Sequence, residues 1–279
     1  MKTTLVTVEE LKAHPEWRVF DCRHELANPD RGAQLYKEGH VPGALFAHLD
    51  RDLSAPKTGE NGRHPLPKPA EFVAWLGRQG LKPSDQVIAY DAMDGMFASR
   101  LWWMLRWVGH DAVAVLDGGY RAWTEAGGAV TTEIPCFAPT VFPATVREDM
   151  NVDVARVQQR LGSPAQLLVD GRAAGRFAGI GETIDPVAGH IPGARNRPYL
   201  DNVGADGRFK PPAQLREEFN RVLAGTPAAD TVHQCGSGVS AAHNLLAMEV
   251  AGLTGGKLYA GSWSEWCSDP ARPVATGTG

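Results

Sequence analysis

The sequence predicts an α/β protein made of two tandem copies of one domain, each with a mostly parallel sheet flanked by helices. Two observations support this prediction. Short aliphatic or β-branched runs alternate with helical stretches, and four motifs occur twice in the same order. Alternating strands and helices are typical of a parallel sheet covered by helices. A chain of 279 residues is also long enough for two domains of ordinary size.

The repeat fixes the expected domain boundaries. The matching pairs are residues 20–23 and 169–172, 39–44 and 189–194, 88–91 and 232–235, and 116–123 and 259–266. The first and last of the three spacings between neighbouring anchors differ by only one residue between the halves, which makes chance similarity improbable. We predict a first domain over residues 5–130, a proline-bearing linker over 131–150 and a second domain over 151–275.

The elements of the two copies follow from local patterns. In the first copy, strands are expected at residues 18–21, 86–90 and 112–116, and helices at 69–77 and 98–108. In the second copy, strands are expected at residues 167–170 and 231–234, and helices at 213–223 and 241–251. Glycines that follow these helices, such as Gly80 and Gly109, are typical helix ends.

Bulk composition excludes several classes of protein. Hydrophobic residues make up 43% of the chain and the net charge is −4, so a basic surface for nucleic acid is not expected. The sequence has no apolar run long enough to span a membrane and no signal-peptide core at its start, so a cytoplasmic location is expected. Four cysteines without short paired spacing argue against a disulfide framework or a zinc site. We expect no cofactor and no metal.

Cys235 is the main candidate for chemistry. It follows the expected strand at 231–234 and precedes a glycine-bearing loop and the start of a helix. This layout aims backbone N–H groups and a helix N-terminus at the sulfur, which favours the thiolate, the form that attacks. Ligands of parallel sheets bind at this end of the strands. A buried structural cysteine is the alternative. The first copy carries Asp91, or a neighbour, in place of the cysteine.

Together these motifs resemble the two-domain rhodanese-type sulfurtransferases over essentially the whole chain. The resemblance depends on the His-x-Pro-Gly-Ala motif in each half, the cysteine loop of the second half and residues 261–266. It implies a silent first domain and an enzyme that moves a sulfane sulfur through a persulfide on Cys235 to a thiol or cyanide acceptor. The backbone N–H groups expected to bind the outer sulfur are those of Gly236, Ser237, Gly238, Val239 and Ser240.

The resemblance also bears on the sulfur donor. The uncharged loop after Cys235 is similar to that of the 3-mercaptopyruvate subgroup, whereas the thiosulfate subgroup typically has basic residues there. By resemblance, Arg176 binds the donor's anionic group. Mercaptopyruvate enzymes generally have a second arginine, which residues 181–189 lack; Arg195 and Arg197 are candidate substitutes. Mercaptopyruvate is favoured, and two alternatives stay open: thiosulfate as donor, and a carrier that delivers sulfur to a thiol-bearing protein.

The resemblance further implies a proton relay. Ser237 would pair with His64 and Asp50 from the first half and pass a proton to the departing enolate. The alternative is an exposed loop histidine and a turn aspartate. This relay places the expected site between the two domains. A cysteine phosphatase is disfavoured, because such enzymes need an arginine six residues after the nucleophile, where this chain has Ala241.

Other thiols and imidazoles are expected to be structural. His40 and His190 recur with their motif and are expected to support the fold. Cys267 is expected to be an inert thiol, although a redox role is the open alternative.

Overall fold

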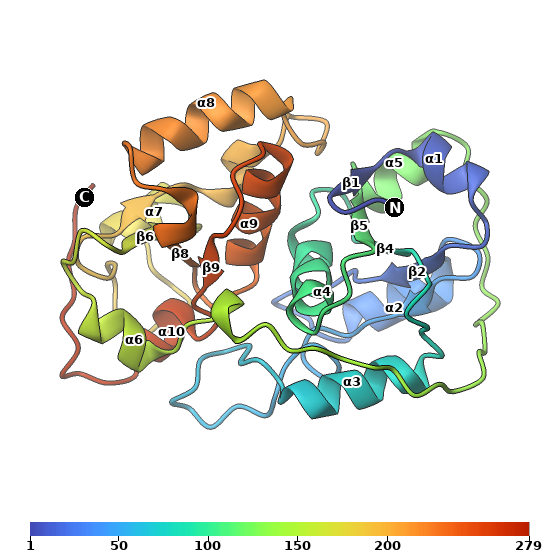
Figure 1. Ribbon diagram of the computed structural model, residues 1–279, viewed down its shortest axis with the longest axis horizontal. Helices are drawn as coiled ribbons and strands as arrows, with labels where there is room; N and C mark the ends of the chain where they lie inside the picture. Colours follow the sequence, from blue (N-terminus) through green and yellow to red (C-terminus); the bar gives the residue numbers. More distant parts are fainter. Residues whose placement is uncertain (279) are drawn as a thin grey trace. The chain divides into compact units, whose positions relative to one another are not determined.

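The computed structural model describes residues 1–278 and divides into two compact units (Figure 1). Unit 1 comprises Met1–Ala55, Pro67–Arg147 and Gly204–Phe209, and unit 2 comprises Pro56–Leu66, Glu148–Val203 and Lys210–Gly279. The expected domains are contiguous in sequence, whereas these units exchange two short segments. The segment Pro56–Leu66, which carries His64, packs with the second half of the chain.

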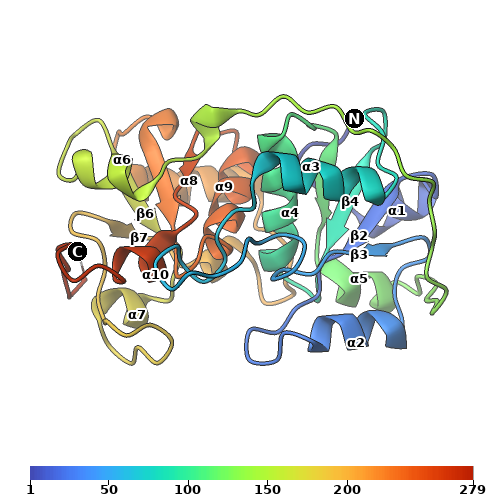
Figure 2. The same cartoon turned by 90° about the horizontal axis from the view of Figure 1, so that it is seen from below.

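The described part of unit 1 contains a five-stranded parallel sheet with the order β1-β5-β4-β2-β3. The strands are β1 (Leu5–Val6), β2 (Arg18–Asp21), β3 (Leu45–Phe46), β4 (Val87–Tyr90) and β5 (Val113–Leu116). The helices are α1 (Val8–Ala13), α2 (Arg31–Glu38), α3 (Pro69–Arg78), α4 (Met96–Trp107) and α5 (Gly119–Glu125). Figure 2 shows α3 and α4 on one side of the sheet and α2 and α5 on the other. Because both faces are covered, every residue of β4 and β5 is buried.

Among the residues described for unit 2, four parallel strands form a sheet with the order β7-β6-β8-β9. The strands are β6 (Leu167–Asp170), β7 (Arg195–Asn196), β8 (Thr231–Gln234) and β9 (Lys257–Leu258). The helices are α6 (Val154–Gln159), α7 (Ala174–Ala178), α8 (Pro212–Leu223), α9 (Ser240–Val250) and α10 (Ser262–Trp266), and the short 3-10 turns are η1 (Glu148–Met150), η2 (Tyr199–Asn202) and η3 (Ala228–Asp230). The predicted fold class is confirmed.

The strand register shows that the two units have the same strand pairing around the loop that follows β4 and β8. Asp21 pairs with Tyr90 in unit 1, and Asp170 pairs with Gln234 in unit 2. The residues that follow, Asp91 and Cys235, therefore occupy equivalent positions at the carboxyl ends of β4 and β8.

The predicted elements agree with the observed ones to within about two residues, the usual uncertainty at element ends. Gly80 and Gly109 follow α3 and α4 with φ of 70° and 92°, a conformation that favours glycine. Across residues 1–278, no helix has the length and apolarity that a bilayer crossing demands.

The recurring histidines support the fold, as predicted. The His40 ring stacks on Tyr36 at 3.9 Å, and its Nδ1 lies 2.7 Å from the Tyr36 carbonyl oxygen. The His190 ring stacks on Phe177 at 3.8 Å, and its Nδ1 lies 2.8 Å from the Phe177 carbonyl oxygen. Both rings are buried, so these contacts satisfy polar atoms within the core.

Candidate active site

Cys235 lies between β8 and α9, and only 2% of its surface is exposed. The backbone N–H groups of Ser237 and Gly238 donate to its Sγ at 3.4 Å and 3.1 Å. The N–H of Trp263 donates to the Cys235 carbonyl oxygen at 2.9 Å, so α10 holds the loop in place. The sulfur is therefore buried and faces fixed N–H dipoles, an arrangement that stabilises negative charge.

The two glycines of the cysteine loop, Gly236 and Gly238, occupy their positions for different physical reasons. Gly238 has φ of 77°, and a methyl group on it would lie 2.4 Å from the Ala260 carbonyl oxygen. Glycine is therefore needed there for both conformation and space. At Gly236 a methyl group would lie 2.6 Å from Nη2 of Arg63, so glycine leaves room for the mobile end of that side chain but is not required by the backbone. The loop then continues through buried Val239 to Ser240, where α9 begins.

Ser237 and His64 lie together in unit 2. Nδ1 of His64 is 2.8 Å from the Ser237 Oγ, and both side chains are buried. The alternative of an exposed loop histidine is wrong, because only 5% of His64 is exposed. Since the Ser237 N–H also points at the Cys235 sulfur, Ser237 contacts both the thiol and the His64 imidazole.

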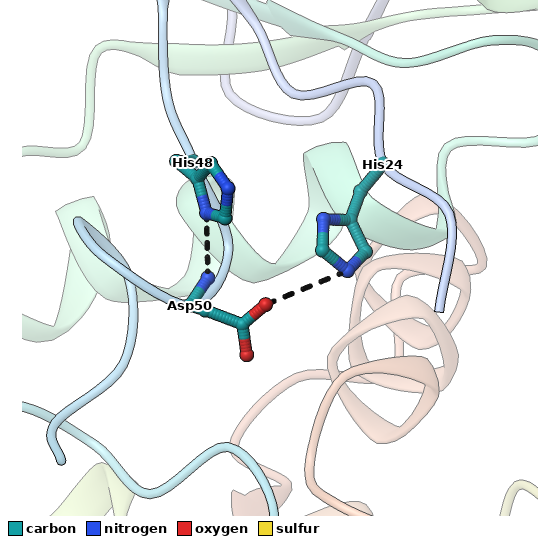
Figure 3. A group of neighbouring side chains, drawn as sticks. All are labelled: His24, His48 and Asp50. Atoms are coloured by element: carbon teal, nitrogen blue, oxygen red, sulfur yellow. Dashed lines mark hydrogen bonds and ion pairs between the residues drawn. The ribbon is translucent and has the colours of Figure 1, made fainter. Parts of the chain in front are cut away.

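Asp50 belongs to unit 1, where Figure 3 shows it beside two histidines. Its backbone N–H donates to Nδ1 of His48 at 3.1 Å, and its Oδ2 is 3.8 Å from Nε2 of His24. One ligand atom from each residue lies within 4.8 Å of the others, a set that a divalent metal accepts. Burial lowers the pKa of His48, which favours the neutral imidazole. Because Nδ1 of this ring accepts the Asp50 N–H, its proton lies on Nε2, and neither nitrogen has a lone pair free for a metal. We therefore assign no metal here.

Arg176, the predicted donor-binding arginine, lies in α7 with its guanidinium near the cysteine loop. Its Nε donates to Glu182 at 2.9 Å and its Nη2 donates to Asp185 at 2.9 Å. A methyl group on Gly236 would lie 3.6 Å from its Nη1. Burial opposes ionisation of Glu182, but the hydrogen bonds from Arg176 and from the Ile184 N–H hold the pKa of this carboxyl below its usual value.

Arg63 is a site residue that sequence reasoning missed. Its Nη1 pairs with Asp185, and its Nη2 is the nitrogen that faces Gly236. Its backbone N–H donates to the Ser264 Oγ at 3.0 Å, which fixes the segment against α10. The available signal was its position: Arg63 immediately precedes His64, which the relay had already singled out.

The two arginines proposed as substitutes lie elsewhere, which corrects that expectation. Arg195 is exposed in β7 and donates to the Val222 carbonyl oxygen at 2.5 Å. Arg197 is buried and donates to Glu218 at 2.6 Å and to Asn202 at 3.1 Å. Both guanidinium groups are thus used to hold structure away from the cysteine loop.

Asp91 occupies the position in unit 1 that Cys235 has in unit 2. Its carboxylate accepts from the backbone N–H groups of Met93, Gly95, Phe97 and Ala98 at 2.8–3.2 Å. Burial raises the pKa of this carboxyl to about 6. The loop that binds a sulfur in one unit therefore binds its own carboxylate in the other, and it contains no thiol nucleophile.

The remaining thiols show no comparable setting. Cys267 follows α10 and is buried, and burial raises the pKa of its thiol above the usual value. Burial likewise raises the pKa of Cys22 well above that of a free thiol. Such thiols stay protonated near neutral pH, so neither is suited to attack.

Fold and site together define a class of protein: a repeated α/β protein in which one copy carries a buried cysteine at the end of a strand and the other carries an acid at the same position. A family model described as a rhodanese-like domain matches residues 4–126 and 153–269. The chain belongs to the rhodanese-like family, as its motifs indicated.

Known relatives specify the reaction class. A probable 3-mercaptopyruvate sulfurtransferase of Pseudomonas aeruginosa is 50% identical over 278 residues, which are 98% of each chain. A putative thiosulfate sulfurtransferase, SseB, of Mycobacterium tuberculosis is 38% identical over 284 residues, 98% of this chain and 97% of the relative. The solved 3-mercaptopyruvate sulfurtransferase of Leishmania major is 32% identical, with a TM-score of 0.86 over 95% of this chain and 74% of that one. This chain is a sulfurtransferase, while the names of its relatives divide between two donors.

Proposed function

We propose that the enzyme takes a sulfur atom from 3-mercaptopyruvate and passes it, through a persulfide on Cys235, to a thiol or cyanide acceptor. The observation that carries this proposal is the position of Ser237. Its N–H points at the Cys235 sulfur, and its hydroxyl lies 2.8 Å from Nδ1 of His64. A nucleophile and a proton source therefore meet at one loop.

In the first step the Cys235 thiolate attacks the donor's sulfur. An S–S bond forms, the donor's C–S bond breaks, and its electron pair leaves with pyruvate as the enolate. The Ser237 hydroxyl protonates this carbanion equivalent, and the proton held on His64 restores the hydroxyl. We place Asp50 as the third member of this relay on the family resemblance.

In the second step an acceptor thiolate or cyanide attacks the outer sulfur of the persulfide. The S–S bond breaks, the acceptor leaves as its own persulfide or as thiocyanate, and the Cys235 thiolate returns. The N–H groups of Ser237 and Gly238, which now reach the sulfur, would also stabilise charge on the persulfide.

The preference for mercaptopyruvate rests on charge. The side chains that follow Cys235 in its loop are uncharged, which leaves a dianion such as thiosulfate without a basic partner in that loop. Mercaptopyruvate has one carboxylate, which an arginine fork can bind, and a leaving group that needs a proton. Thiosulfate is the second candidate because several relatives are named for it.

The test compares the two donors at fixed cyanide concentration. We expect a higher kcat/KM for mercaptopyruvate, because a charge-assisted contact contributes about 1.5–3 kcal/mol, or about one to two decades in binding. Equal or better use of thiosulfate would overturn the preference and favour the second candidate.

We also propose a reducing compartment, the cytoplasm, as the place of action. The four cysteines are free in the structure and one of them, Cys136, is exposed. Free exposed thiols suit a compartment where thiols stay reduced. A thiol-bearing protein is a further candidate acceptor, which competition with a small thiol would reveal.

A further inference from the structure

We infer that Arg63 and Arg176 form a two-arginine clamp for the anionic group of the donor, and that Asp185 positions both guanidinium groups. This inference rests on the proposed function, because it assigns the binding site of the same donor. The clamp joins the segment Pro56–Leu66 to α7, two parts of unit 2 that lie far apart in the sequence.

The geometry divides each guanidinium into a held side and an open side. Nη1 of Arg63 and Nη2 of Arg176 both bind Asp185. Nη2 of Arg63 and Nη1 of Arg176 have no hydrogen-bond acceptor among residues 1–278. A methyl group on Gly236 would lie 2.6 Å from Nη2 of Arg63, 3.6 Å from Nη1 of Arg176 and 3.7 Å from Nη2 of Arg176, the nitrogen that also binds Asp185. Both guanidinium groups therefore converge over the residue next to Cys235.

The burial of the three side chains indicates that Asp185 positions the two arginines and that the arginines face the ligand. The Asp185 side chain is 2% exposed, whereas those of Arg63 and Arg176 are 28% and 22% exposed. The acid thus lies beneath the arginines, and the arginines face solvent and the loop. Because Asp185 binds neither Nη2 of Arg63 nor Nη1 of Arg176, it orients the clamp and does not compete with the donor for these two nitrogens.

Electrostatic repulsion between Arg63 and Arg176 explains why the carboxylate of Asp185 is needed to hold the clamp together. Burial lowers the pKa of Arg63, and the nearby positive charge of Arg176 lowers this pKa further. A negative charge on Cys235 raises the pKa of Arg63. Two guanidinium groups that face one point repel each other, and a carboxylate bridging their far sides offsets that repulsion.

The charge balance of the cluster defines the class of ligand. Asp185 and Glu182 match the two positive charges of Arg63 and Arg176, so the clamp offers directed N–H donors with little net charge. Such a site suits a planar monoanion, since a carboxylate can accept one N–H from each arginine. The donor class is therefore a thiol-bearing monocarboxylate, in preference to a dianion.

The decisive experiment measures donor kinetics of Arg63→Ala, Arg176→Ala and the double variant, with 2-mercaptoethanol as the acceptor. Each single change should raise the KM for mercaptopyruvate about tenfold to hundredfold, because each removes one charge-assisted contact. The KM for the neutral acceptor should change by less than about twofold. Arg195→Ala, which removes an exposed arginine of the same unit, is the matched control and should leave both values unchanged.

Asp185→Asn tests the positioning role. The KM for mercaptopyruvate should rise severalfold with kcat largely kept, and the same change in the double arginine variant should add nothing further. A lowered KM would show that Asp185 competes with the donor, and would overturn its assignment. Should Asp185→Asn not fold, Arg63→Lys, which keeps the charge but loses the fork, should still raise KM.

Failure of the clamp can be distinguished from failure of the proposed function. An unchanged donor KM in Arg63→Ala, with an active wild-type enzyme, overturns the clamp alone. A wild-type enzyme that forms no persulfide from mercaptopyruvate overturns the proposed function itself. A persulfide that still forms in Arg63→Ala at saturating donor, with a raised KM, supports both.

Discussion

At the scale of single residues, Ser237 links the two halves of the proposed reaction. Its N–H stabilises charge on the Cys235 sulfur, and its hydroxyl lies against His64. The N–H belongs to the backbone, so it stabilises charge whatever the side chain is. The hydroxyl is specific to serine, so its removal separates proton transfer from charge stabilisation.

Ser237→Ala should therefore affect the two donors differently. Turnover of mercaptopyruvate should fall about a hundredfold or more, because the enolate loses its proton source. Turnover of thiosulfate should fall much less, because sulfite leaves as a stable anion without a proton. The measurement is kcat for each donor, with Ser163→Ala, a half-buried residue between α6 and β6, as control. An equal fall for both donors would show that the hydroxyl has only a structural role.

At this scale the sequence identified Cys235, Ser237, His64 and Arg176 correctly as neighbours of one loop, and Asp50 in unit 1 as a further candidate. It could not identify Arg63 as their neighbour, because the contact between Arg63 and Asp185 joins segments more than a hundred residues apart. It also proposed Arg195 and Arg197, because their motif lay closest in sequence. Proximity in sequence is a weak guide to which guanidinium reaches a loop.

At the scale of elements, the loop between β8 and α9 depends on backbone shape. Local patterns predicted the strand and helix, since periodicity and glycine ends are local signals. They did not separate the roles of the two loop glycines, because clearance depends on distant neighbours. Gly238 faces the Ala260 carbonyl oxygen, whereas Gly236 faces Arg63.

Gly238→Ala should damage the loop through both strain and crowding. The left-handed conformation costs a non-glycine residue about 1–2 kcal/mol, and the methyl group would also meet the Ala260 oxygen. We expect a lower melting temperature and at least about a tenfold loss of kcat, since misplaced N–H groups no longer reach the sulfur.

Gly162→Ala is the matched control for this change. Gly162 also has positive φ, at 75°, but apart from its own chain neighbours no atom of the described residues lies within 4 Å of the added methyl group. It should lose stability through strain alone and keep its kcat. A Gly238→Ala enzyme with the kcat of the control would contradict the assigned role of the loop.

At the scale of the whole molecule, the repeat gives a physical reason to expect that only the second copy is catalytic. Both units place an acceptor of N–H groups after an equivalent strand, a thiol in one and the Asp91 carboxylate in the other. The sequence predicted both copies, because motifs and spacing are visible in one dimension. It did not predict that Pro56–Leu66 packs with unit 2, because that depends on contacts such as Arg63 with Ser264.

This exchange predicts the behaviour of a truncated enzyme. A fragment over residues 148–279 lacks Pro56–Leu66, and with it Arg63 and His64. Its activity should be no higher than that of the full chain carrying Arg63→Ala and His64→Ala together. The comparison uses kcat/KM for mercaptopyruvate. A soluble fragment with wild-type activity would show that the first half of the chain is dispensable.

The central claim, a persulfide on Cys235, is tested most directly by mass spectrometry of the enzyme after incubation with mercaptopyruvate and no acceptor. We predict the added mass of one sulfur atom on the peptide that contains Cys235, its loss on addition of cyanide, and no added sulfur or turnover in Cys235→Ser. Variants at Cys22, Cys136 and Cys267 should keep most activity. Full turnover by Cys235→Ser, or sulfur found on another cysteine, would contradict the account.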